Sequence, residues 1–176
     1  MIKLRNIVQE SSGRRLVVFD FDDTLARTDS YIYLTKADGS KVTLDPAEYA
    51  VYKPEPGDTF DYSDFNRMLR NPRIIKHNVD MMRAAMRNPQ NKVTILTARA
   101  LAFPIRHYFK TVHGFEPYVI GVGSSDPKKK SDWIANHIRK GYTDVFFIDD
   151  SPKNIKAVAA LQQEFPNARI KTVLAK

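Results

Sequence analysis

The chain has 176 residues, of which 43% are hydrophobic and 27% charged, as is usual for a globular domain with one core. It contains no cysteine, which excludes disulfides and thiolate metal sites. It also lacks an apolar run long enough to span a membrane and a hydrophobic signal core near residue 1. We therefore expect a single domain over residues 1–176 that is cytoplasmic and has no membrane partner.

The formal net charge of +8 is unevenly distributed. Residues 28–65 contain eight acidic and three basic side chains, so the rest of the chain carries all of the positive excess. A basic body favours polyanionic partners such as nucleic acid or phosphorylated metabolites. A solvated basic surface without such a partner explains the charge equally well.

Five short apolar runs, rich in β-branched and aromatic residues, predict buried strands. They lie at residues 16–21, 93–96, 118–122, 145–148 and 170–174. Helical patterns separate them, at residues 75–86, 104–112 and 131–139 and again from Pro152 onward, behind Ser151 as N-cap. Alternating strands and helices predict an α/β fold, in which a parallel sheet of about five strands has helices on both faces.

A segment between the first two strands interrupts this alternation. The sequence YIYLTKADGSKVTL at residues 31–44 predicts a β-hairpin that turns at Asp38-Gly39. The next stretch, residues 45–57, is rich in proline and predicts irregular chain. We call residues 28–65 the flap. Because it directly follows the first strand, we expect it to lie over that strand's carboxyl end, where open parallel sheets bind ligands.

Two acidic pairs follow predicted strands. Asp20 and Asp22 come after the first strand, and their side chains share one side if strand geometry holds through both. Asp149 and Asp150 end the fourth strand. If the two strands are neighbours, the four carboxylates converge, and oxygen ligands without cysteine or histidine nearby suit Mg²⁺. The sequence thus predicts a Mg²⁺ site of Asp20, Asp22, Asp149 and Asp150 that is able to receive a phosphate.

Two further segments offer groups for that phosphate. The run VTILTAR ends a strand with a hydroxyl and a guanidinium, and DPKKKSDWI places three lysines at a helix start. Lys130 is favoured among them because a tryptophan and an isoleucine follow at i+3 and i+4, as at the start of an amphipathic helix. Lys129 is the alternative and Lys128 also stays open. The candidate phosphate-binding residues are Thr97, Ala98, Arg99, Lys130 and Lys129.

The order of these elements resembles the haloacid dehalogenase superfamily of aspartate-nucleophile phosphotransferases. The pattern D-x-D-x-T at residues 20–24 precedes a strand ending in Thr97, then a lysine, then a strand ending in D-D. The resemblance spans residues 16–151 and implies a Rossmann-like fold with Mg²⁺ in its site. Taken singly, each element has a plainer reading, as a helix cap, a strand-end hydroxyl or a solvated lysine run, and an inactive relative stays open.

The resemblance also implies a role for each matching residue. Asp20 matches the nucleophile that forms an aspartyl-phosphate. Asp22 matches the general acid and base, with its backbone carbonyl on the metal. Thr97 and one lysine match the groups that hold the phosphoryl, and Asp149 matches a metal ligand assisted by Asp150. An acid two residues after the nucleophile favours a phosphatase or phosphomutase, since the leaving alkoxide needs a proton.

The small size of the flap predicts an open site, which favours a nucleic-acid end or a nucleotide as substrate. The layout is loosely similar to the phosphatase half of bacteriophage-type polynucleotide kinase-phosphatases, which remove 3′-phosphates, although no kinase phosphate-binding loop is present. The candidate contacts to a nucleic-acid backbone are Arg67, Arg70, Arg73, Lys76, Arg99 and Lys153. The flap aromatics that stack on a base or pack the flap are Tyr31, Tyr33, Tyr49, Tyr52, Phe60 and Tyr62. A small-metabolite phosphatase and a non-catalytic nucleic-acid-binding relative are the alternatives.

Overall fold

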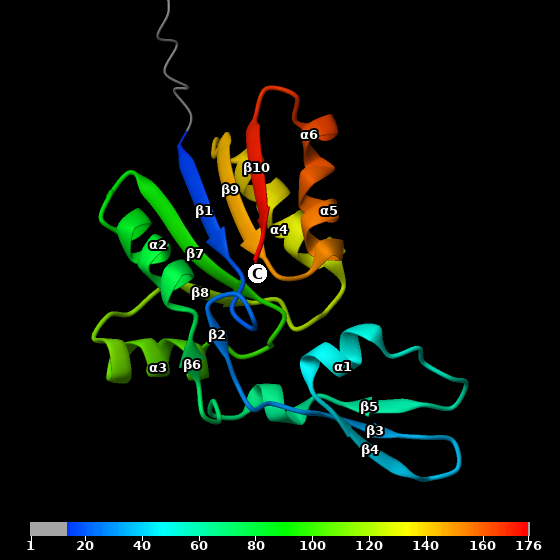
Figure 1. Cartoon of the computed structure of the whole chain (residues 1–176). Helices are drawn as coiled ribbons and strands as arrows, with labels where there is room; N and C mark the ends of the chain where they lie inside the picture. The colour runs from blue at the N-terminus through cyan, green and yellow to red at the C-terminus, as the bar shows by residue number, and fades with distance from the viewer. Residues whose placement is uncertain (1–13, 176) are drawn as a thin grey trace, which may run out of the picture.

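A parallel five-stranded sheet forms the centre of the computed structural model, which describes residues 14–175 (Figure 1). The strand order is β10-β9-β1-β7-β8. The strands are β1 (Arg15–Phe19), β7 (Asn91–Thr97), β8 (Val119–Gly121), β9 (Asp144–Asp149) and β10 (Arg169–Leu174). The five predicted strands are confirmed, each within a few residues, and the sheet is Rossmann-like.

Helices cover both faces of this sheet, as predicted. Successive residues of β1 alternate between the two faces, so Val17 and Phe19 pack with α2 and α3, whereas Leu16 and Val18 pack with α4 and α5. The helices are α2 (Lys76–Met86), α3 (Phe103–His113), α4 (Pro127–Arg139), α5 (Pro152–Ala159) and α6 (Leu161–Glu164). Helix α4 begins four residues before its predicted start, because Asp126 caps it by accepting from the Lys128 backbone N–H. None of the helices between residues 14 and 175 is long and apolar enough to cross a membrane.

The strand order reverses between β1 and β9. The chain runs from β1 outward through β7 and β8, then returns to the other side of β1 to form β9 and β10. At such a switch point the two connections leave in opposite directions and open a crevice at the carboxyl ends of the strands. The residues that follow β1 and end β9 therefore meet at one place.

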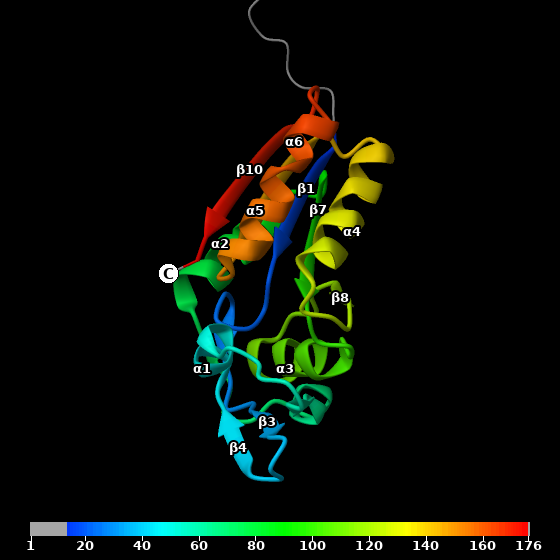
Figure 2. The same ribbon diagram turned by 90° about the vertical axis from the view of Figure 1, so that its right-hand side faces the viewer.

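The flap lies beyond the carboxyl ends of the parallel strands (Figures 1 and 2). Strands β3 (Ile32–Thr35) and β4 (Lys41–Leu44) form the predicted hairpin, and Gly39 adopts a φ of 84° at its turn. A third strand that we did not predict, β5 (Thr59–Asp61), pairs with the other edge of β3. Ile32, Leu34 and Leu44 form a small separate core of this sheet.

The prediction of irregular chain after the hairpin is wrong in part. Residues Pro46–Val51 form helix α1. The Asp45 side chain accepts from the Glu48 backbone N–H, and the Glu48 side chain accepts from the Asp45 N–H in return. This reciprocal capping box, with proline at the first helical position, stabilises a helix too short to persist alone.

The two ends of the flap are fastened side by side. Strand β2 (Ala26–Arg27) pairs antiparallel with β6 (Arg73–Ile74), before and after the flap. Between these two strands in the sequence lies the 3₁₀ helix η1 (Ser63–Asn66). Its buried Asp64 carboxylate accepts hydrogen bonds from the Tyr31 backbone N–H and the Tyr33 hydroxyl. The flap is thereby anchored close to the end of β1.

Candidate active site

A tight turn after β1 presents Asp20 and Asp22 to the crevice. The Phe21 carbonyl accepts from the backbone N–H groups of three following residues, Thr24, Leu25 and Ala26. Asp23 has a φ of 53°, in the left-handed region that aspartate tolerates better than most residues. The strand has ended at Phe19, so the expected strand alternation through Asp22 does not hold, and the turn places the two carboxylates instead.

Asp20, Asp149 and Lys130 form a buried ion cluster at the switch point. The Lys130 Nζ lies 2.5 Å from an Asp20 oxygen and 2.7 Å from an Asp149 oxygen. The exposed fractions of the three residues are 5%, 0% and 2% for Asp20, Asp149 and Lys130. Lys129 is exposed and Lys128 pairs with Asp132 on the surface of α4, so Lys130 is the lysine that the fold brings to the aspartates.

The pKa values in this cluster are displaced by burial and by neighbouring charges. Burial raises the pKa of Asp20 well above its ordinary value, Lys130 opposes that rise, and three nearby carboxylates add to it. Burial alone lowers the pKa of Lys130, but Asp20 and Asp149 more than offset this and raise it, so the ammonium stays charged. The cluster therefore carries more negative charge than its single lysine balances.

Asp20, Asp149 and Asp150 can hold one metal ion. Each offers a carboxylate oxygen, and these oxygens all lie within 4.8 Å of one another. One lysine against three carboxylates leaves two negative charges, which a divalent cation would balance. Partial burial and the carboxylates of Asp149 and Asp23 raise the pKa of Asp150 to about 6, as expected for a carboxylate held near others. The all-oxygen donor set suits a hard divalent cation, the class to which Mg²⁺ and Ca²⁺ belong.

Helix α5 orients Asp149 within this site. The Ser151 backbone N–H donates to one Asp149 oxygen at 2.8 Å, and the Asn154 side-chain amide donates to both oxygens at 3.0 Å. Asn154 was not among the predicted site residues. Its position in the first turn of a helix capped by Ser151, five residues after Asp149, is the signal that would have identified it.

Asp22 does not belong to the three carboxylates that could share a metal ion, and it is held by Arg99. The Arg99 Nε and Nη2 donate to the two Asp22 oxygens at 2.9 and 2.7 Å, a bidentate pair. Arg99 is only 2% exposed, and its remaining donors reach the flap, at the Ser30 hydroxyl and the Phe65 carbonyl. We predicted a phosphate contact for Arg99; the structure places its guanidinium on Asp22 and on both ends of the flap.

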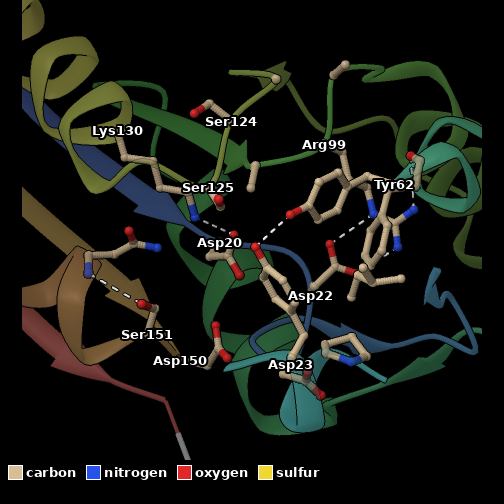
Figure 3. Close-up of a pocket in the computed structure, with 18 of the residues that line it drawn as sticks. Asp20, Asp22, Asp23, Tyr62, Arg99, Ser124, Ser125, Lys130, Asp150 and Ser151 are labelled. Carbon is tan, nitrogen blue, oxygen red and sulfur yellow. Dashed lines mark hydrogen bonds and ion pairs between the residues drawn. The ribbon is translucent and has the colours of Figure 1, made fainter. Parts of the chain in front are cut away.

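Thr97 is the last residue of β7 and Ala98 follows it, beside the Asp22–Arg99 pair. The Thr97 side chain is fully buried, and its hydroxyl accepts from the Arg99 backbone N–H at 3.2 Å. Ala98 is exposed and lines a cavity of about 500 Å³ together with Asp20, Asp22 and Lys130. Figure 3 shows Asp20 between Lys130 on one side and Asp22 with Arg99 on the other. Of the five expected phosphate-binding residues, Ala98, Arg99 and Lys130 line this cavity, whereas Thr97 and Lys129 do not.

The absence of a side chain at Gly121 lets the loop that carries Arg99 pass over β8. A Cβ atom at Gly121 would lie 2.4 Å from the Arg99 carbonyl oxygen and 2.6 Å from that of Ala100. We expect Gly121→Ala to displace this loop, to lower the free energy of unfolding by about 1–3 kcal/mol and to weaken any activity that needs Asp22. Chemical denaturation measures the change in the free energy of unfolding.

Gly114→Ala is the matched control for this substitution. Gly114 has a φ of 71° at the end of α3, but nothing lies within 4 Å of its missing Cβ. The control therefore bears only the left-handed backbone strain of alanine and leaves the site in place. Equal losses of activity in both variants would contradict the steric explanation.

Most of the predicted nucleic-acid contacts are paired with acidic residues of the same chain. Arg67 and Arg70 face Asp64, and Arg73 faces Asp29. Lys76 likewise pairs with its helix neighbour Asp80, and Arg99 is bound to Asp22. Lys153 is exposed at the start of α5. The structure therefore does not gather these residues into one free basic surface.

We compared the chain with models of protein families, with curated protein sequences and with solved structures. None of the three comparisons found a match.

Proposed function

We propose that the chain is a Mg²⁺-dependent phosphomonoester hydrolase of the haloacid dehalogenase type that works through an aspartyl-phosphate. The observation that carries this proposal is the cluster at the switch point. A lysine from α4 bridges a carboxylate that follows β1 and one that ends β9, all three buried, with Asp150 within reach of the same ion. Buried charges are expensive, so such a cluster suggests a chemical task.

Asp20, Asp149 and Asp150 would hold the metal ion, with the backbone carbonyl of Asp22 as the further ligand that the resemblance implies. When bound, Mg²⁺ would offset the repulsion between these carboxylates and an anionic phosphate. Lys130 contributes a second positive charge beside Asp20. Both charges favour the ionised form of Asp20, which a nucleophile requires.

The chemistry of the chain itself then has two steps. One Asp20 oxygen accepts from Lys130, and the other attacks phosphorus, so that an Asp20–phosphorus bond forms and the bond to the leaving oxygen breaks. Asp22, in the protonated form that it takes once one of its Arg99 contacts has loosened, gives its proton to that leaving oxygen. In the second step Asp22 takes a proton from water, which attacks the same phosphorus, and Asp20 and inorganic phosphate are released.

Arg99 positions the acid for this sequence. Because both Asp22 oxygens accept from Arg99, the carboxylate is fixed in direction before a substrate arrives. The same guanidinium holds the flap, so we expect substrate that moves the flap to loosen one of the two contacts and free Asp22 for proton transfer. The proposed substrates are nucleic-acid ends with a 3′-phosphate or nucleotides, with small metabolites as the second candidate.

Arg99→Lys should lower kcat about 100-fold, with a smaller effect on KM. A lysine offers one compact ammonium, which cannot make two parallel bonds to Asp22 and also reach the Phe65 carbonyl. A misplaced catalytic group typically accounts for a loss of about this size. Steady-state kinetics measures it, with Arg106→Lys on the exposed face of α3 as the control. Unchanged kcat would remove Arg99 from the mechanism.

The experiment that tests the function is phosphate release from a panel of substrates with and without Mg²⁺. The panel contains a 3′-phosphorylated oligonucleotide, a 5′-phosphorylated one, free mononucleotides and a generic aryl phosphate. We expect release from at least one substrate that stops with a chelator and returns with added Mg²⁺. Oligonucleotide binding without phosphate release from any substrate would overturn the proposal and favour a non-catalytic nucleic-acid-binding protein.

A further inference from the structure

The cavity has two chemically different sides. The sheet side carries the ionic groups already described, and the flap side faces it with apolar and aromatic residues. Those flap residues are Ile32, Pro46, Tyr49, Tyr62 and Phe65. A phosphate on the ionic side would direct its leaving group toward the flap. A volume of about 500 Å³ lies within the range of sites that enclose a small organic ligand.

A pair of tyrosines dominates the flap side. The hydroxyl oxygens of Tyr49 and Tyr62 are 2.6 Å apart, and the rings meet edge to face with centroids 5.7 Å apart. One hydroxyl proton is shared between the two oxygens, and the other has no acceptor among residues 14–175. That proton is available to a ligand. Burial and the hydrogen bond with Tyr49 raise the pKa of Tyr62 above its ordinary value, so the Tyr62 hydroxyl keeps its proton beside a phosphate.

The other flap tyrosines with assigned hydroxyl bonds serve the flap itself. Tyr33 donates to the buried Asp64, and Tyr52 donates to Asp58 at 2.8 Å. Tyr62 differs because it is 41% exposed, although it lines the cavity. Figure 3 shows it on the side of Asp22 and Arg99, across from Lys130 and Ser151. An exposed aromatic ring at the wall of a cavity offers a stacking surface.

The charge around the cavity disfavours a long polyanion. The flap has eight acidic and three basic side chains, and five of the six residues predicted to contact a nucleic-acid backbone are paired with acids. A polynucleotide gains most of its affinity from free basic groups that neutralise successive phosphates. A single phosphomonoester needs only the cation and Lys130.

We infer that the flap side binds the leaving group of a monomeric phosphomonoester through one planar ring system, of the size of a nucleoside, stacked on Tyr62. This inference rests on the proposed function and narrows its substrate from nucleic-acid ends and nucleotides to the free nucleotide or a molecule of that chemistry. The free hydroxyl proton of the Tyr49–Tyr62 pair would donate to a ring or sugar oxygen.

Tyr62→Leu tests the stacking directly, since leucine keeps an apolar side chain without the ring. We expect kcat/KM for nucleoside monophosphates to fall about tenfold, the size expected for loss of one stacking contact, while that for glycerol phosphate stays within about threefold. Tyr118→Leu, an exposed tyrosine next to β8 that does not line the cavity, should change neither. Equal losses for both substrates would overturn the inference.

A comparison of substrate lengths tests the preference for a monomer. We expect a thymidine 3′-monophosphate or 5′-monophosphate to be hydrolysed faster than an oligothymidylate with the same terminal phosphate. Faster hydrolysis of the oligonucleotide would overturn the inference and leave the proposed phosphatase in place.

A binding measurement separates failure of this inference from failure of the proposed function. Calorimetric titration of the Asp20→Asn variant with Mg²⁺ and a nucleoside monophosphate needs no turnover, and glycerol phosphate provides the ring-free comparison. Tighter binding of the nucleotide that Tyr62→Leu weakens about tenfold supports the ring site even if no substrate is hydrolysed. Equal binding of the two ligands overturns the ring site even if hydrolysis is normal.

Discussion

Asp20→Asn should abolish Mg²⁺-dependent phosphate release, with a loss of at least about a thousandfold in kcat. The amide of asparagine does not attack phosphorus, so the aspartyl-phosphate cannot form. The fold should persist, because asparagine keeps an oxygen for Lys130 and because Asp149 still balances that lysine. Release of phosphate from the best substrate of the panel, with excess protein, measures the residual rate.

Asp23→Asn provides a matched control for this result. Like Asp20, Asp23 is an aspartate, and it lies three residues further along the chain in the same turn. Asparagine tolerates the φ of 53° that Asp23 adopts. It lines the cavity but does not belong to the three carboxylates that can share an ion. A control with near-normal turnover assigns the loss to Asp20. Residual turnover above about one per cent in Asp20→Asn would contradict a covalent role for this residue.

Lys130→Met should lower the free energy of unfolding by about 3–5 kcal/mol when no divalent cation is present, because it leaves two buried carboxylates without a counter-charge. Asp20 and Asp149 are 5% and 0% exposed, so solvent compensates little for the loss of the lysine charge. The methionine itself fits the volume of the lysine stem. Denaturant unfolding in the presence of a chelator measures the difference.

Two comparisons make this result specific. Lys129→Met alters the adjacent, exposed lysine and should leave the unfolding transition unchanged. Added Mg²⁺ should restore more stability to Lys130→Met than it adds to the unchanged protein, because the uncompensated carboxylates then bind the cation more tightly. If Lys130→Met were as stable as the Lys129→Met control, the charge of Lys130 would not be needed to balance the Asp20 and Asp149 carboxylates, and the prediction would be wrong.

The sequence predicts the parallel sheet well because its strands are buried on both faces. Such strands read as continuous apolar runs, and the alternation with helices leaves few topologies. Lys130 is predictable for a related reason, since the helical period sets its direction relative to Trp133 and Ile134. By contrast, β5 has three residues with only one partly buried, so its pairing with β3 leaves no local pattern.

Two features of the site escape sequence reasoning for different physical causes. Helix α1 carries a capping box, but the prolines and glycine that follow within ten residues mask it. The pairing of Arg99 with Asp22 joins residues 77 positions apart, and an arginine beside a strand end looks the same whether it faces a phosphate or a carboxylate. Only the tertiary structure decides whether Arg99 contacts a phosphate or a carboxylate, because it determines which group lies within reach of the guanidinium.

Because the two-residue ladder between β2 and β6 closes the flap at its base, the flap can vary in sequence largely independently of the sheet. Arg27 and Arg73 lie opposite each other, so the segment between them, which contains the flap, leaves the domain and returns to it at the same place. Its small core of Ile32, Leu34 and Leu44 is separate from the two cores of the sheet. Outside the Ser30 and Phe65 contacts of Arg99, mutations can therefore accumulate in this segment and change which molecules fit the cavity without disturbing Asp20, Lys130 and Asp149.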